Sequence, residues 1–432
     1  MNHPEEQYSR ESFLKNFIKD FRVNTKKTNN TDDDNNNNNP TNLKKIYEII
    51  YSDIYKAYTY INSKEYTQNM RSDILAIDKK NNNEKKPSSY DSTFLPKEIH
   101  DYIKENGKYQ LTYSHTEPSI KIHFTLFSET ELEHLDNYTQ QVRIMLMWLY
   151  ICRLYSAKTC VNQIDIYIYP TPHNKKLPKS TVNILSADNV NTAYTYHCPA
   201  DGEIVIFRNE EWFKVFLHET FHTYGLDFAN VPISKNNNVV NATLRRLFPI
   251  ESEFNATEAY TETWARIMNC AICVFCALKN KQDHAKFAEY MESSLELERA
   301  FSAFQCNKIL KFMGMEYKDL YEASEKSAAL RLHLYKEKTS VFAYYILTSL
   351  FMNDATGFLN WCYTHNSSLL QFNNRSQQSL KDFAEYIEKE YKNKTFNECL
   401  QQMNELYTTA TKKTRTRMNQ LLIETTRMTL LG

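Results

Sequence analysis

The alternation of apolar and polar positions separates the chain into a strand-forming part and a helical part. Residues 120–127, "IKIHFTLF", alternate at period two, which is typical of a strand. Strands are predicted at residues 120–127, 163–170, 191–197 and 203–208, and a helix at 138–155. After about Phe228 almost every segment is predicted to be helical. The predicted fold class is therefore α+β and helix-rich, with a mixed sheet first and an all-helical half after it.

Two polar stretches set the first part of the chain apart. Residues 29–40, "NNTDDDNNNNNP", cannot bury apolar surface and are predicted to be disordered. A second polar break at 79–89 follows a tyrosine-rich helical stretch. We therefore expect three parts: a loosely attached helical extension with asparagine-rich disordered segments over 1–93, a sheet-containing lobe over 94–226, and a helical lobe over 227–432. The basic stretch 411–428 is expected to present a solvated helix face.

Composition narrows the class of protein. Six glycines among 432 residues favour helices, and 52 basic against 52 acidic residues give no electrostatic reason to expect a nucleic-acid partner. No apolar run reaches the roughly 18 residues that a membrane span needs, and the first residues lack an apolar export signal. An intracellular, cytoplasmic protein is expected. Nine cysteines, an odd number, favour reduced thiols over a disulfide framework.

The stretch "WFKVFLHETFHTYGLDF", residues 212–228, carries the candidate chemistry. At about 100° per residue its apolar side chains form one stripe. The members of the stripe are Phe213, Phe216, Leu217, Thr220, Phe221 and Tyr224. His218 and His222 lie opposite it, one turn apart, so that both imidazoles can reach one Zn²⁺. Glu219 points off the ligand axis, where it can accept a proton from metal-bound water.

A catalytic zinc site needs a third protein ligand. Asp227 is one residue early for an extended form of the motif, and we interpret it as a polar cap where Gly225 ends the helix. Glu251 and Glu253 in "FPIESEF" are further candidates, although both can be solvated instead.

The favoured third ligand is Glu258, in "NATEAYTETWARIMN". A helix is predicted to open after Asn255, with Glu258 and Glu262 one turn apart on one face. Glu258 can bind the metal while Glu262 holds a ligand histidine by a hydrogen bond. The alternative is a capping box, in which Glu258 reaches back to the amide of Asn255.

The two motifs together resemble those of the gluzincins, the thermolysin-like branch of the zincin metallopeptidases. The family pattern N-E-A-x-x-D stands here as "TEAYTE", residues 257–262, with Glu262 in place of the usual aspartate. The resemblance implies zinc ligands His218, His222 and Glu258, with Glu262 behind them. It also implies a zincin-like sheet lobe with an edge strand for extended substrate, followed by a helical lobe, with the motif helix between them.

The activity that this resemblance implies is zinc-dependent hydrolysis of a peptide or protein substrate, with Glu219 as general base. Tyr344, Tyr345 and His333 are the candidate donors to the oxyanion. Two other functions stay open: a zincin-fold binding or structural protein, such as a virion protein, that has lost catalysis, and a zinc hydrolase of a non-peptide amide. The whole chain is also similar to metallopeptidases of large DNA viruses, mostly in composition, which adds packaging in a virion to the expected locations.

Overall fold

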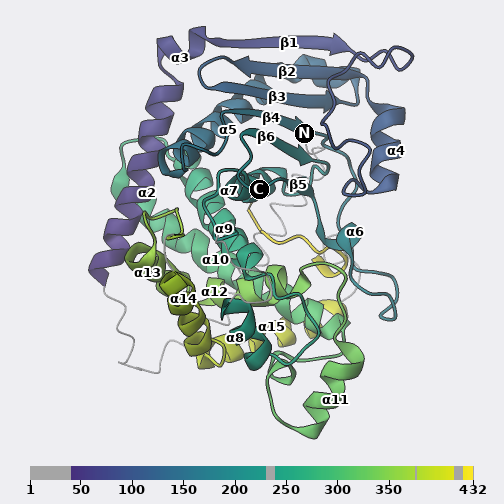
Figure 1. Ribbon diagram of the computed structural model, residues 1–432, viewed down its shortest axis with the longest axis vertical. Coiled ribbons are helices and arrows are strands. Elements are labelled where there is room, and N and C mark those ends of the chain that lie inside the picture. Colours follow the sequence, from purple (N-terminus) through teal and green to yellow (C-terminus); the bar gives the residue numbers. More distant parts are fainter. Residues whose placement is uncertain (1–39, 230–238, 375–376, 413–421, 432) are drawn as a thin grey trace.

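The computed structural model describes residues 40–229, 239–374, 377–412 and 422–431. Within them every strand lies before residue 207, and after that point the regular elements are helices. Figure 1 shows the sheet at one end of the molecule and most of the helices at the other. The predicted helix-rich α+β class is confirmed.

One mixed sheet contains all six strands of the described ranges. They are β1 (Met70–Ala76), β2 (Tyr109–His115), β3 (Ser119–Leu126), β4 (Gln163–Ile168), β5 (Ala193–Thr195) and β6 (Asp201–Ile206). Their order is β1-β2-β3-β4-β6-β5. The three central strands β3, β4 and β6 run parallel to one another, whereas the pairs β1–β2, β2–β3 and β5–β6 are antiparallel. β5 is therefore an antiparallel edge strand.

The four predicted strands correspond to β3, β4, β5 and β6, and the predicted helix to α5. β1 and β2 were missed. β1 leaves most of its side chains exposed, so it has no buried face to produce an alternating pattern.

Helices make up the rest of the described chain. They are α2 (Pro40–Ile61), α3 (Lys64–Gln68), α4 (Lys97–Asn106), η1 (Glu129–His134), α5 (Leu135–Tyr155), α6 (Ala187–Val190), α7 (Trp212–Thr223), α8 (Val239–Leu247), α9 (Ala256–Ala277), α10 (His284–Phe312), η3 (Tyr317–Leu320), α11 (Glu325–Leu334), η4 (Phe342–Leu347), α12 (Thr348–Asn353), α13 (Ala355–His365), α14 (Gln377–Glu390) and α15 (Lys394–Lys412). α7 carries the paired histidines and contacts β5 and β6 as well as α9.

The N-terminal part differs from the expected loose extension. α2 buries Ile46, Ile50 and Ile54 and packs against α5, α9, α10 and α13. β1 pairs along its whole length with β2. The polar break at 79–89 is also tied down, because Ser89 donates a hydrogen bond to Glu203 over 2.8 Å. Residues 40–93 thus belong to the main body, while the predicted disordered segment lies outside the described residues, apart from Pro40.

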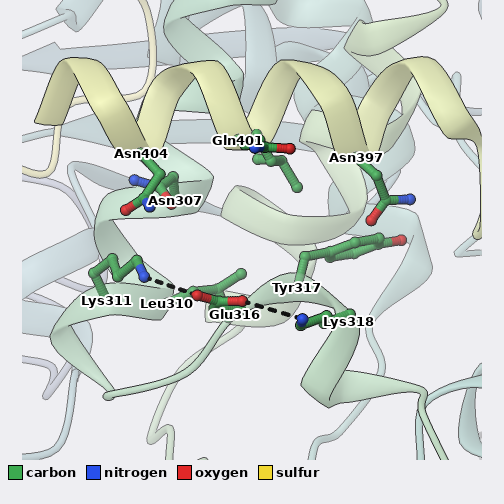
Figure 2. A pocket seen from close by; sticks show the side chains of 10 residues that line it. Asn307, Leu310, Lys311, Glu316, Tyr317, Lys318, Asn397, Gln401 and Asn404 are labelled. Atoms are coloured by element: carbon green, nitrogen blue, oxygen red, sulfur yellow. Dashed lines mark hydrogen bonds and ion pairs between the residues drawn. The ribbon is translucent and has the colours of Figure 1, made fainter.

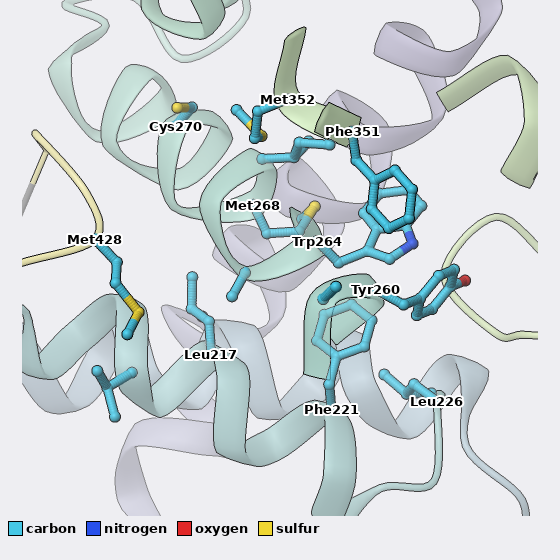
Figure 3. Packing of buried hydrophobic residues seen from close by; sticks show 14 of the residues in the cluster. Leu217, Phe221, Leu226, Tyr260, Trp264, Met268, Cys270, Phe351, Met352 and Met428 are labelled. Atoms are coloured by element: carbon cyan, nitrogen blue, oxygen red, sulfur yellow. The ribbon is translucent and has the colours of Figure 1, made fainter. Parts of the chain in front are cut away.

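Apolar packing fixes α7 against α9 (Figure 3). The rings of Phe221 and Trp264 stack with their centroids 6.3 Å apart, and neither side chain is exposed. Leu217 and Met268 are buried in the same cluster. Because interiors are close-packed, this contact leaves the two helices little freedom to shift relative to each other.

The C-terminal segment, residues 422–431, runs through the interior. The expected solvated helix is wrong for residues 425–428, where Thr425, Thr426 and Met428 are buried, whereas Thr411, at the end of α15, is exposed as expected. The backbone N–H groups of Met428 and Thr429 donate to Glu211, and those of Leu430 and Leu431 donate to Glu298.

One disulfide joins Cys160 to Cys198, so the expectation of reduced thiols is wrong for these two cysteines. The other seven cysteines form no disulfide, in line with that expectation. The disulfide packs against Gly225, whose φ of +60° ends the motif helix as predicted. No helix within the described ranges combines the length and apolar character that a membrane crossing needs.

The packing of α2 makes a stability prediction. Ile54→Ala removes a fully buried side chain, and we expect it to lower the free energy of unfolding by about 2–5 kcal/mol. Lys56→Ala, at an exposed position on the same helix, should change it by less than about 0.5 kcal/mol. Denaturant unfolding measures both. Equal stability of the two variants would show that α2 is as loosely attached as its sequence suggested.

Candidate metal centre

α7 is buried on nearly all sides. The predicted apolar stripe packs inward, but the histidine face is covered too, since His218 is 5% and Glu219 8% exposed. β5 and β6 cover one side of the helix and α9 another. The two imidazoles therefore lie largely covered between the sheet edge and α9, where His218 lines a small cavity and His222 keeps 13% of its side chain exposed.

Three ligand atoms converge there. The Nε2 atom of His218 lies 3.0 Å from Oε2 of Glu258 and 3.2 Å from Nε2 of His222, and the latter is 3.4 Å from the same oxygen. Donors about 2.0–2.1 Å from a tetrahedral zinc lie roughly 3.3–3.4 Å apart. The spacing of these three atoms is thus close to that of one face of a zinc tetrahedron. Among the described residues, His218, His222 and Glu258 are the group that could hold a metal ion, and we call them the metal-ligating group in this sense.

The outer nitrogen of each ring defines its tautomer. Nδ1 of His218 lies 3.0 Å from Glu262, and Nδ1 of His222 lies 2.5 Å from Asp227. A carboxylate accepts, so each Nδ1 carries a proton, and when the rings are neutral, as metal binding requires, each turns an Nε2 lone pair inward. Two such lone pairs and a Glu258 oxygen then face one another. The lone pairs and the carboxylate oxygen repel one another unless a positive charge lies between the three atoms, so the donor set fits a divalent cation.

The pKa shifts agree with that electrostatic picture. Burial disfavours the imidazolium of His222, but Glu258 and Asp227 outweigh it and raise its pKa well above the usual range. His218 shows a raised pKa for the same reason, with burial opposed by hydrogen bonds to Glu258 and Glu262. Burial would raise the pKa of Glu258, yet the two histidines hold it well below its ordinary value. Positive charge is favoured at the centre of the cluster.

Glu262 joins α7 to α9 by ionic contacts. Its two oxygens accept from Lys214 over 2.9 and 3.0 Å, and one also accepts from Arg266 over 2.9 Å. The other oxygen holds His218. All four side chains are buried. Burial would raise the pKa of Glu262, but Lys214 and Arg266 keep it well below its usual value. The carboxylate stays charged and orients the first imidazole.

Asp227 holds the second imidazole. Besides His222, it accepts from Nε2 of His197 over 2.7 Å. Its pKa is lowered, because the two histidines outweigh the effect of burial. Its interpretation as a cap of the motif helix is therefore wrong, and it does not belong to the metal-ligating group.

The other candidates for a third ligand do not belong to the group formed with the two histidines. Glu251 and Glu253 are exposed. Asn255 is the N-cap residue of α9, but its side chain makes no cap hydrogen bond, so the predicted capping box with Glu258 is wrong. Among the described residues, Glu258 is the carboxylate that lies within 3.4 Å of the Nε2 atoms of both histidines.

The candidates for the oxyanion donor lie in three places. Tyr344 reaches the site and donates to Oε2 of Glu258 over 2.8 Å. Tyr345 points elsewhere, with its hydroxyl on the carbonyl of Thr426. His333 is exposed on α11, far from α7 in Figure 1. Tyr344 stands on η4, a π-helical turn, and such turns commonly redirect a side chain at a functional site.

Glu219 lies beside the converging atoms but is not one of them. Its pKa is raised by burial, partly offset by His218 and His222. With His218 and Tyr344 it lines a small cavity that also touches β5. Glu219 is thus positioned to exchange a proton with a group in that cavity.

Four residues of the site were missed from the sequence. Arg266 follows Glu262 by four residues on one helix face, a spacing that predicts an ion pair and gave a usable signal. Lys214 was a polar residue inside an apolar helix. His197 and Met428 carry no local signal, because only the folded chain brings them close.

A second cavity, of about 430 Å³, lies between α10, η3 and α15 (Figure 2). Glu316 bridges Lys311 and Lys318 at its rim by ion pairs of 3.2 and 3.7 Å. None of the residues that line this cavity belongs to the metal-ligating group.

Comparison with protein-family models, with curated proteins and with solved structures finds no match to this chain. The function is therefore inferred from the geometry of the site.

The buried ion pairs of Glu262 with Lys214 and Arg266 lead to a prediction about stability. Glu262→Gln leaves Lys214 and Arg266 buried without a carboxylate, and we expect a loss of about 3–5 kcal/mol in the free energy of unfolding of the metal-free protein. Glu388→Gln is the matched control, because its ion pair with Arg246 is exposed to solvent and should contribute little to the free energy of unfolding. Similar losses from both changes would contradict the buried network.

Asp227 makes a prediction about metal affinity. Asp227→Asn removes the carboxylate that orients His222, so we expect zinc affinity to fall about 10- to 100-fold. Competition with a chromogenic chelator measures this. Asp283→Asn, at the N-cap of α10, should leave the affinity unchanged. An unaltered affinity in Asp227→Asn would mean that the aspartate plays no part in metal binding.

Proposed function

We propose that this chain is a zinc-dependent metallopeptidase of the gluzincin type. The observation that carries the proposal is the convergence of His218, His222 and Glu258, with Glu219 one residue along α7 and outside the ligand set. Two imidazoles and one carboxylate form a donor set that suits catalytic zinc and leaves a position free for water or substrate.

Zinc bound by these residues would supply Lewis acidity, which polarises the scissile carbonyl and lowers the pKa of water. The protein supplies the proton transfers. Glu219 takes a proton from the attacking water and delivers it to the leaving amine, a role that requires a carboxylate within reach of both. Its place in the cavity shared with His218 and Tyr344 supports this assignment.

Tyr344 is the proposed donor to the developing oxyanion. Its hydroxyl lies at the ligand group, 2.8 Å from Oε2 of Glu258. A rigid donor aimed at developing charge inside a dry cleft stabilises the transition state more than one in water. Packing of η4 against α9 holds this tyrosine in place.

The edge strand is the proposed seat of the substrate. β5 is the last strand of the sheet and contacts α7. An extended peptide can add to such an edge by main-chain hydrogen bonds. This would present a peptide bond to Glu219, which supports a peptide or protein substrate.

The test compares zinc-loaded wild type with Glu219→Gln. We expect the variant to bind zinc with unchanged stoichiometry and to cleave peptides about 10²- to 10⁴-fold more slowly. Chelation should abolish wild-type cleavage, and added zinc should restore it. Glu253→Gln, at an exposed glutamate, is the control and should remain active.

Three outcomes would contradict the proposal. Full activity in Glu219→Gln would show that Glu219 is not the general base. A zinc-loaded wild type that cleaves no peptide in a proteome-derived mixture would favour a binding or structural protein. Hydrolysis of small non-peptide amides, with peptides left intact, would indicate the third function.

A further inference from the structure

A small cavity opens beside Glu219. Its volume is about 30 Å³. It is bounded by His218 and Glu219 of α7, by Thr192 and Ala193 at the start of β5, by Tyr344, and by Met428. It therefore joins the proposed general base, the substrate-binding edge strand and a wall that comes from the C-terminal segment.

The volume restricts what can enter. A water molecule needs about 10–15 Å³ of such accessible volume, so the cavity holds about two water molecules. The methyl group of alanine or the hydroxymethyl group of serine matches this size, while a leucine or phenylalanine side chain has several more heavy atoms. Only a small side chain fits without movement of the walls.

Met428 forms a wall that is held in place. Its backbone N–H and that of Thr429 both donate to Glu211 over 2.5 Å, and the other oxygen of Glu211 accepts from Lys175. The sulfur of Met428 lies 3.8 Å from Nζ of Lys214. Figure 3 shows its side chain next to α7. The methionine therefore limits the depth of the cavity.

Thr192 adds a polar feature. It is 4% exposed, and among the described residues its buried hydroxyl oxygen has no hydrogen-bond partner. Leaving such a group unpaired costs about 1–3 kcal/mol, and a ligand hydroxyl can recover part of that cost. The two lysines of the lining are already paired, Lys175 with Glu211 and Lys214 with Glu262. The cavity thus suits a small neutral side chain better than an acidic one.

We propose that this cavity receives the side chain of a residue flanking the scissile bond, and that Met428 restricts that residue to alanine or serine. The inference rests on the proposed peptidase function. A peptide paired with β5 alternates its side chains between the two faces of the sheet. One of them therefore points towards the cavity next to Glu219.

The test uses peptide hydroxamates that differ only in the side chain next to the zinc-binding group, namely alanine, serine, leucine or phenylalanine. Their dissociation constants are measured by calorimetry on the zinc-loaded full chain. On wild type we expect the leucine and phenylalanine compounds to bind at least about 10-fold more weakly than the alanine compound. Met428→Ala should reduce that ratio to about one, because it enlarges the cavity.

Three further variants sharpen the result. Met428→Leu keeps the volume and should keep the wild-type selectivity. Val215→Ala widens the cavity from α7 and should relax selectivity even if Met428→Ala does not fold. Thr192→Val removes the hydroxyl and should lower the ratio of serine to alanine affinity, by about 3- to 10-fold.

Equal affinity of wild type for small and large side chains would overturn the proposal. So would unchanged selectivity in zinc-loaded Met428→Ala or Val215→Ala. These results are distinguishable from failure of the proposed function, because hydroxamate binding needs no turnover. Selective binding without peptide cleavage supports the cavity and refutes the peptidase. Cleavage only between large residues supports the peptidase and refutes the cavity.

Discussion

One buried carboxylate, that of Glu262, links the two helices on which the metal-ligating group stands. It accepts from Lys214 and His218 of α7 and from Arg266 of α9. A charge in the interior is costly unless it is paired and fully hydrogen-bonded. Few placements of α7 against α9 satisfy all these donors at once. The need to pair the buried carboxylate with donors from both helices therefore defines the relative position of His218 and Glu258, which lie on these helices.

Apolar packing and ionic pairing act together on this geometry. The stacked pair Phe221 and Trp264 resists sliding of α7 along α9, while Glu262 and Asp227 define the rotation of the two imidazoles. A metal site needs both, since ligand atoms misplaced by a fraction of an ångström lose coordination geometry. The site is thus a product of the core around it.

The predictability of the fold followed burial only in part, since β2 was missed although most of its side chains are buried. β3 and β4 place alternate aliphatic or aromatic side chains in the main core, such as Ile122, Phe124 and Ile166, and this alternation revealed them in the sequence. β1 is mostly exposed, and its residues show no such period. The pattern of α2 predicted a helix correctly, but an amphipathic pattern does not identify the surface that covers it. For this reason its place in the main core was missed.

The sequence by itself determined the features that a single helix encodes. His218, Glu219 and His222 share a fixed angular relation in α7, and Glu258 and Glu262 share one in α9, because helix geometry sets these spacings. Only the tertiary structure decided which acid reaches the imidazoles.

It also decided that Asp227 pairs with His222, and that Met428 walls the cavity beside Glu219. These contacts join elements that are distant in the chain or lie across an irregular turn. Local periodicity carries no information about such distances, since they depend on how the whole core packs.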